Sequence, residues 1–135
     1  MITQDTLQVI VFSIHQKEVK YLLLRRIPAK GGFWQPITGR KEKNESPKDG
    51  ALRELQEELG IPIQKIIDVD NFPNGQGEGK DYIFAAEVLP SVEIRLDRPS
   101  VEHDHYQWCT YQEARTLLYW PQYTKALDRL KRMIK

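Results

Sequence analysis

The sequence predicts an α/β fold in which helices cover a β-sheet. Segments rich in β-branched and apolar residues precede, separate and follow the segments that carry helix signals, which is typical of a sheet with helices packed on it. The chain has 135 residues, of which 40% are hydrophobic and 29% are charged. These values suit one compact domain and argue against wholesale disorder. We therefore expect residues 1–135 to fold as a single domain.

The N-terminal part of the chain predicts the first strands of this sheet. Residues 6–15 and 19–25 are rich in β-branched and apolar side chains and are separated by a short polar break, so we expect two neighbouring strands. Residues 27–33 contain one proline and two glycines and predict a loop. A short extended piece at 35–38 and an exposed polar segment at 40–45 should follow.

The strongest local signals predict a helix over residues 47–59. Ser46 is a favourable N-cap residue, and Pro47 occupies the first helical position, where proline is tolerated. Asp49 lies three residues after the cap, so it can complete an arrangement like a capping box and face the positive end of the helix dipole. Gly60 should end the helix in a left-handed conformation.

The C-terminal part predicts further strands and two more helices. A glycine-rich segment at 71–80 predicts a loop. The remaining elements follow from apolar alternation and helical periodicity: strands at 63–69, 82–88, 92–96 and 106–110, and helices at 112–118 and 122–133.

Composition excludes several classes of protein. Twenty Lys and Arg residues balance nineteen Asp and Glu residues, so the net charge is +1. This balance argues against a nucleic-acid partner, because duplex binding requires a strongly basic surface. No apolar run approaches the ~20 residues of a membrane span, and the N-terminus lacks a signal-peptide pattern. Cys109 is the single cysteine, which excludes an internal disulfide. We expect a cytoplasmic protein without membrane association.

The helix at 47–59 carries a distinct acidic face. At ~100° per residue, Glu54, Glu57 and Glu58 share an arc of about 100°, whereas the leucines form a separate stripe that can pack on a sheet. That stripe consists of Leu52, Leu55 and Leu59. Clustered carboxylates repel one another, and hard divalent cations relieve this repulsion. A solvated acidic face is the simpler interpretation, and a site for Mg²⁺ or Mn²⁺ is the functional one.

The spacing around this helix matches a known motif in full. Gly39 is followed after five residues by Glu45, and after seven more by the run Arg53-Glu54-Leu55-Gln56-Glu57-Glu58-Leu59-Gly60-Ile61. This pattern over residues 39–61 resembles the Nudix box. The order of predicted strands also resembles the Nudix fold, which is an α/β/α sandwich around a central mixed β-sheet.

The resemblance implies roles for the residues of the box. Glu57 and Glu58 would be metal ligands, and Glu54 would be a further ligand or the general base. Gly39 would offer its backbone carbonyl to the metal, which would be Mg²⁺ or Mn²⁺. Arg53 would take part in catalysis by orienting a carboxylate, either Glu54 or Glu45.

Short stretches outside the box resemble those of dihydroneopterin triphosphate pyrophosphatases. The stretch that contains Glu102 and Trp108 suggests Glu102 as an additional catalytic carboxylate, and the approach to the box contributes Trp34 and Gln35 as candidate substrate-binding residues. Arg26, at the end of a predicted strand, has the charge to contact a polyphosphate. Lys80 follows the glycine-rich loop, which can admit a base or a pterin.

We therefore expect a metal-dependent pyrophosphohydrolase that acts on a small nucleoside or pterin polyphosphate. Dihydroneopterin triphosphate and purine deoxynucleoside triphosphates are the favoured substrates. Dinucleoside polyphosphates, nucleotide sugars and capped RNA ends are alternatives within the same class, and a Nudix module that binds a nucleotide without cleaving it is an alternative from another class. The resemblance also allows a homodimer.

Overall fold

The computed structural model describes residues 2–74, 79–97 and 102–134. These described residues contain seven strands: β1 (Ile2–His15), β2 (Glu18–Arg26), β3 (Trp34–Gln35), β4 (Ile37–Glu42), β5 (Lys65–Pro73), β6 (Lys80–Glu87) and β7 (His103–Cys109). The helices are the short 3₁₀ turn η1 (Pro28–Lys30), and α1 (Pro47–Glu58), α2 (Tyr111–Leu117) and α3 (Pro121–Met133). Within these residues, no helix is long and apolar enough to cross a membrane.

The strands form one mixed sheet around β1. Its central path runs β3-β2-β1-β6-β5, with β4 paired to β1 and β7 paired to β2. The pair between β1 and β6 is parallel, and the other strand pairs are antiparallel. One edge of β1 pairs with β4 up to Val9 and with β2 from Val11 onward, so β1 changes partner between these two residues.

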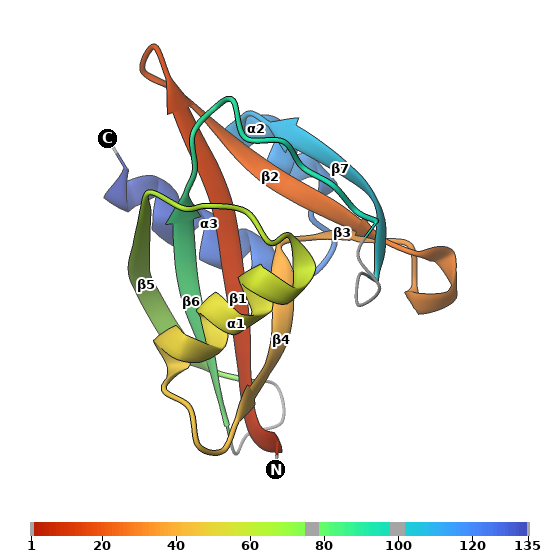
Figure 1. Cartoon of the computed structure of the whole chain (residues 1–135), viewed down its shortest axis with the longest axis vertical. Coiled ribbons are helices and arrows are strands. Elements are labelled where there is room, and N and C mark those ends of the chain that lie inside the picture. Colours follow the sequence, from red (N-terminus) through yellow and green to blue (C-terminus); the bar gives the residue numbers. More distant parts are fainter. Residues whose placement is uncertain (1, 75–78, 98–101, 135) are drawn as a thin grey trace.

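Helices cover both faces of the sheet, which confirms the predicted α/β architecture. Figure 1 shows α1 across one face and α3 behind the other. Successive side chains of a strand point to opposite faces. Accordingly, Val9 and Val11 pack in the cluster that contains Leu55 of α1, whereas Ile10 and Phe12 pack with the apolar residues of α3.

The local signals of α1 act as predicted. The Ser46 hydroxyl accepts a hydrogen bond from the Asp49 backbone N–H at 3.1 Å, and Pro47 is the first helical residue. Gly60 has φ +60° and follows the last turn, which is the left-handed position that glycine adopts most readily. The helix ends at Glu58, one residue before the predicted end, because Leu59 forms its C-cap.

The apolar side of α1 makes a prediction for stability. Leu55 is 3% exposed and packs in the core, whereas Leu52, one turn away, is only partly buried. Leu55→Ala should lower the free energy of unfolding by about 2–5 kcal/mol, because it removes a fully buried side chain and leaves a cavity. Leu52→Ala serves as the matched control and should cost clearly less in urea unfolding. Equal losses would mean that the helix buries a different face.

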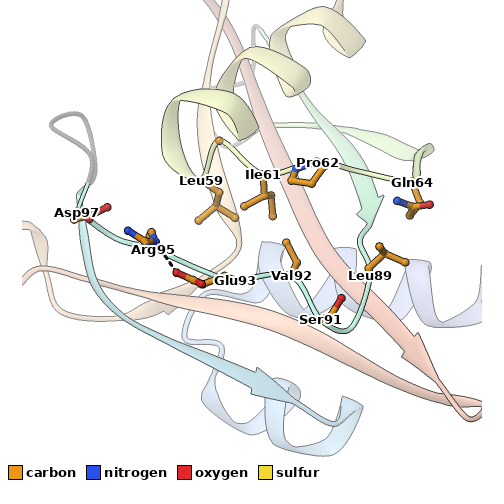
Figure 2. Close-up of a pocket in the computed structure, with 11 residues that line it drawn as sticks. Leu59, Ile61, Pro62, Gln64, Leu89, Ser91, Val92, Glu93, Arg95 and Asp97 are labelled. Carbon is orange, nitrogen blue, oxygen red and sulfur yellow. Dashed lines mark hydrogen bonds and ion pairs between the residues drawn. The ribbon is translucent and has the colours of Figure 1, made fainter.

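One predicted strand is wrong. Residues 92–96 alternate apolar and charged side chains as a half-buried strand does, yet they form no strand in the structure. Ile94 is buried, and Val92 and Leu96 pack against the same cluster as α1. Figure 2 shows this segment as an extended loop that passes the C-terminal end of α1. The alternation therefore reports the burial of one side of the segment, whereas a strand also requires a hydrogen-bonded neighbour.

Two other segments are more extended than predicted. The extended piece predicted at 35–38 continues as β4 to Glu42, so the first residues of the polar segment predicted at 40–45 belong to a strand that pairs with β1. Pro36 separates β3 from β4, which is expected because proline has no N–H to donate to a sheet. The hairpin after β5 is shorter than predicted, since Pro73 pairs with Lys80. The centre of the predicted glycine-rich loop, at 75–78, lies outside the described residues.

Candidate active site

Glu54 of α1 lies directly over Gly39 of β4. A Cβ atom at position 39 would be only 2.2 Å from the Glu54 Cδ atom and 2.3 Å from its Oε1 atom. Real side-chain atoms do not approach so closely, so any larger residue at position 39 would have to displace the end of the Glu54 side chain. The structure therefore brings together two residues that the sequence predicts to share a site.

Arg53 connects the carboxylates around this position. Its Nε and Nη2 atoms donate to the two carboxylate oxygens of Glu45 at 3.0 and 2.8 Å. Its Nη1 atom donates to Glu54 at 2.9 Å and to Glu57 at 3.3 Å. The sequence predicts that Arg53 orients either Glu54 or Glu45, and in the structure it contacts both.

The pKa values of the two carboxylates that Arg53 contacts most closely are shifted in opposite directions. Burial raises the pKa of Glu54 above its ordinary value, although Arg53 opposes this shift. The hydrogen bonds from Arg53 lower the pKa of Glu45. The buried negative charge of Glu54 would therefore be stabilised by a nearby cation or by protonation. Glu45 instead holds Arg53 in place through two hydrogen bonds.

The raised pKa of Glu54 makes stability depend on pH. A group whose pKa is raised on folding stabilises the native state below its unfolded pKa, and this contribution is lost as the pH rises through the folded pKa. Glu54→Gln removes the buried charge, so at pH 7 the variant should be more stable than the wild type in urea unfolding. Its advantage should shrink as the pH falls through the raised pKa of Glu54, and it should be gone below about 4.5, the ordinary value for Glu. A variant less stable than the wild type at pH 7 would contradict this assignment.

Glu58 lies on the same helix but is buried against a different partner. The residue is 9% exposed, and its Oε1 atom forms a very short hydrogen bond to His103 Nδ1 from β7. The other ring nitrogen, Nε2, is 2.9 Å from the Gln35 amide nitrogen, and the Tyr123 hydroxyl donates to the Gln35 amide oxygen at 3.0 Å. The sequence did not predict this connection, because Glu58 and His103 are 45 positions apart.

The carboxylates of α1 do not form a ready-made metal cluster. Over the described ranges, no group of three or more His, Cys, Asp or Glu side chains is arranged to hold a metal ion. Arg53 contacts Glu54 and Glu57, whereas Glu58 is held by His103. The donors are nonetheless oxygen atoms, which suit Mg²⁺ or Mn²⁺. The close contact of Glu54 with Gly39 fits such an ion, because it brings a carboxylate next to the residue whose backbone carbonyl is the predicted metal ligand.

A hollow of about 470 Å³ lies beside Gly39 and combines residues from both ends of the chain. Arg26 and Glu102 lie on its wall and form an ion pair at 3.3 Å. Lys30 pairs with the other oxygen of Glu102 at 3.2 Å, and this contact is the main reason that the pKa of Glu102 is lowered. The predicted catalytic carboxylate therefore reaches the hollow, but two cationic side chains neutralise it.

This hollow also contains a second set of polar residues, which the sequence did not predict to belong to the site. Asp81 accepts hydrogen bonds from Gln8 Nε2 at 2.7 Å and from the Thr6 hydroxyl at 3.0 Å, and burial raises its pKa. Gln122 and Tyr123 of α3 complete this side of the hollow. One signal was available: Gln8 interrupts a strand in which both of its neighbours, Leu7 and Val9, are apolar. Buried polar residues of this kind carry hydrogen bonds that a structure must satisfy.

A separate hollow of about 420 Å³ lies near the C-terminal end of α1. Figure 2 shows Leu59, Ile61, Val92 and Leu89 around it, with the Arg95–Glu93 ion pair near one end. Its lining includes none of the glutamates of α1 and is largely apolar. We therefore place the candidate chemistry at Gly39 and Glu54 rather than in this hollow.

Comparison with known proteins identifies the family of the chain. A family model described as the NUDIX domain matches residues 5–130. The chain belongs to the Nudix family. The structure of a Nudix protein from Listeria monocytogenes has a TM-score of 0.79 and 26% identity, and covers 97% of this chain and 94% of that one. The predicted family and fold are thus confirmed.

The curated Nudix relatives have diverse names. An octanoyltransferase of Myxococcus xanthus is 37% identical over 110 residues, which span 76% of this chain but only 30% of that protein. The asymmetrical bis(5'-nucleosyl)-tetraphosphatase of Rattus norvegicus is 35% identical over 105 residues, 71% of this chain and 67% of that protein. Further matches are named RNA pyrophosphohydrolase (Nitratiruptor), dihydroneopterin triphosphate diphosphatase (Haemophilus influenzae) and CTP pyrophosphohydrolase (Escherichia coli).

Of the four predicted substrate-binding residues, only Arg26 lines the hollow beside Gly39 in the structure of this chain. Gln35 is 1% exposed and uses both ends of its amide on His103 and Tyr123, so it lies behind the hollow. Trp34 is partly buried and packs against the core on the α3 side. Lys80 is exposed at the start of β6 and does not line the hollow.

Proposed function

We propose that this protein is a divalent-metal-dependent hydrolase that cleaves a phosphoanhydride bond in a nucleoside-triphosphate-like substrate. The proposal rests on the close packing of the Glu54 carboxylate against Gly39, beside a hollow whose lining includes Arg26 and Glu102. The carboxylates provide ligands of the type that Mg²⁺ and Mn²⁺ take, and the cationic wall suits phosphate oxygens.

In this proposal, Glu57 and Glu58 hold the metal together with the Gly39 carbonyl, and Glu54 is either a further ligand or the general base. A bound divalent ion neutralises phosphate charge and lowers the pKa of coordinated water. Arg53 keeps Glu54 and Glu57 on the same side of α1 through its Nη1 atom. Since burial raises the pKa of Glu54, its carboxylate is suited to accept a proton from the attacking water.

The two cationic residues that pair with Glu102 would bind the polyphosphate. Arg26 and Lys30 both lie within hydrogen-bonding range of Glu102. An incoming phosphate can exchange with this carboxylate, because it offers the two cations the same type of acceptor with more charge. In this role Glu102 keeps the two cations close to the site before substrate arrives.

An exposed aromatic cluster supports a substrate with a planar ring. Tyr119 and Trp120 are 69% and 41% exposed, and their rings stand edge to face at 4.8 Å. Phe33 contacts both rings, and the Arg26 guanidinium lies 5.9 Å from its centroid. Bases and pterins stack well on such surfaces. Dihydroneopterin triphosphate and purine deoxynucleoside triphosphates are therefore our favoured substrates.

A dinucleoside polyphosphate is the second candidate substrate. The observation that favours it is the 35% identity to a bis(5'-nucleosyl)-tetraphosphatase. Such a substrate has two planar bases, and the aromatic cluster would accommodate one of them. Nucleotide sugars, capped RNA ends and binding without cleavage remain alternatives that the same experiment separates.

The test is a panel of substrates incubated with the full chain in Mg²⁺, in Mn²⁺ and in EDTA. We expect a monophosphate and pyrophosphate, or an equivalent pair, from one of the triphosphates, and no products in EDTA. Chromatography of the products distinguishes this outcome from cleavage of dinucleoside polyphosphates. Turnover that is unchanged in EDTA would refute the metal requirement, and tight nucleotide binding without products would favour a binding module.

A further inference from the structure

A line of hydrogen-bonded side chains crosses the protein from α3 to α1. It starts at the Tyr123 hydroxyl, continues through the Gln35 amide and the His103 ring, and ends at the Glu58 carboxylate. All four residues are buried, with exposed fractions of 1–9%. Tyr123 packs in the core cluster on the α3 side, whereas Glu58 belongs to α1 on the other face.

The chemistry of the groups fixes the direction of these hydrogen bonds. The Tyr123 hydroxyl donates to the Gln35 amide oxygen, so the amide N–H group is the one that faces His103. The Nε2 atom of His103 must then accept, which places the ring hydrogen on Nδ1. The Nδ1–H group is the partner of Glu58, and a carboxylate is an acceptor.

The first donor in this line is reliably protonated. Burial raises the pKa of Tyr123 to about 12. At neutral pH its hydroxyl therefore keeps the hydrogen that orients the Gln35 amide. Tyr123 also lines the hollow beside Gly39, so the line begins at the wall of the candidate substrate site and ends at a glutamate of α1.

We propose that His103 is a positioning residue for Glu58: it donates from Nδ1–H to Oε1 and leaves Oε2 to coordinate the catalytic cation. The inference rests on the proposed function, in which Glu58 is a metal ligand. Partners of this kind fix the orientation of a ligand, and their loss commonly weakens metal binding 10- to 100-fold.

A neighbouring glutamate and a neighbouring histidine, Glu57 and His105, lack the features that distinguish the Glu58–His103 pair. The Glu57 side chain is 51% exposed and contacts Arg53 from its own helix. Glu58 is instead fixed by a residue from another element of the fold, so the rotamer freedom that coordination would remove is already lost. His105, two residues along β7, has a side chain that is 58% exposed and pairs with Asp104. It therefore provides a control histidine on the same strand.

The first arm of the test uses the unmodified protein. Long-range ¹H–¹⁵N spectra of the ¹⁵N-labelled full chain at neutral pH report which nitrogen of each histidine carries the hydrogen. We expect His103 to show a protonated Nδ1 and an unprotonated Nε2. A hydrogen on Nε2 would overturn the proposal, and this result does not depend on whether the protein hydrolyses anything.

The second arm measures Mn²⁺ binding without substrate, by calorimetry or by the EPR signal of the free ion. His103→Ala should raise the dissociation constant about 10- to 100-fold. His103→Asn should recover part of the loss, because its amide can donate to Glu58, and His105→Ala should leave the constant unchanged. Equal Mn²⁺ affinity in folded His103→Ala and wild-type protein would refute the positioning role. If the Mn²⁺ affinities of the wild type and the variants follow the expected order but the wild type hydrolyses no substrate, only the proposed function would be refuted.

Discussion

Glu58→Gln should reduce turnover of the best substrate by about 10²- to 10⁴-fold, which corresponds to several kcal/mol of transition-state stabilisation. The amide has almost the same shape as the carboxylate and can still accept the hydrogen bond of His103 Nδ1. Folding should therefore be preserved, while the negative charge that holds the cation is lost. The measurement is initial rates at saturating Mg²⁺ for wild-type and variant protein.

The matched control for this variant is Gln56→Ala on the same helix. Gln56 is exposed and lies outside the arc that Glu54, Glu57 and Glu58 share on α1. Its replacement should change the rate by less than about twofold. Glu57→Gln should also lose activity, since Glu57 is the second proposed ligand. Equal rates in the wild type and both glutamate variants would end the claim that these carboxylates bind the metal.

Gly39→Ala should have the second largest effect, with a loss of activity of about 10²-fold. The added methyl group would lie 2.2 Å from the Glu54 Cδ atom, so the carboxylate must move. A misplacement of about 1 Å at a catalytic group is enough for a loss of this size. The cost in stability should be smaller, about 1–3 kcal/mol, because the group that yields is the end of a flexible side chain.

A double-mutant cycle identifies the cause of that loss. If the methyl group acts by displacing Glu54, it should cost little further activity in a protein that already carries Glu54→Gln. We therefore expect the activities of Gly39→Ala/Glu54→Gln and Glu54→Gln to differ by less than about threefold. Multiplicative losses would mean that the two residues act independently and that the close contact has no catalytic meaning.

Local signals predicted the parts of the site that are close together in sequence. Ser46 and Gly60 define α1 to within one residue, because capping and the left-handed turn depend on neighbours along the chain. The i,i+4 spacing of Arg53 and Glu57 also made their contact foreseeable on a helix.

The contacts that decide the chemistry of the site are mostly long-range. Glu58 lies on the predicted acidic arc, yet it is buried against His103 rather than grouped with Glu54. Gln8 and Asp81, 73 positions apart, meet because β1 and β6 pair in parallel. Periodicity places a residue on a face, but it does not say which distant residue will cover that face.

The proposed metal site itself has the most direct test. Crystals of the full chain grown with Mn²⁺ and a non-hydrolysable triphosphate can be measured at the manganese absorption edge. Our account predicts an anomalous peak that contacts carboxylate oxygens of Glu57 and Glu58, next to Glu54 and the Gly39 carbonyl, with the triphosphate between this peak and Arg26. A bound triphosphate without manganese at these oxygens, or manganese bound only elsewhere, would contradict it.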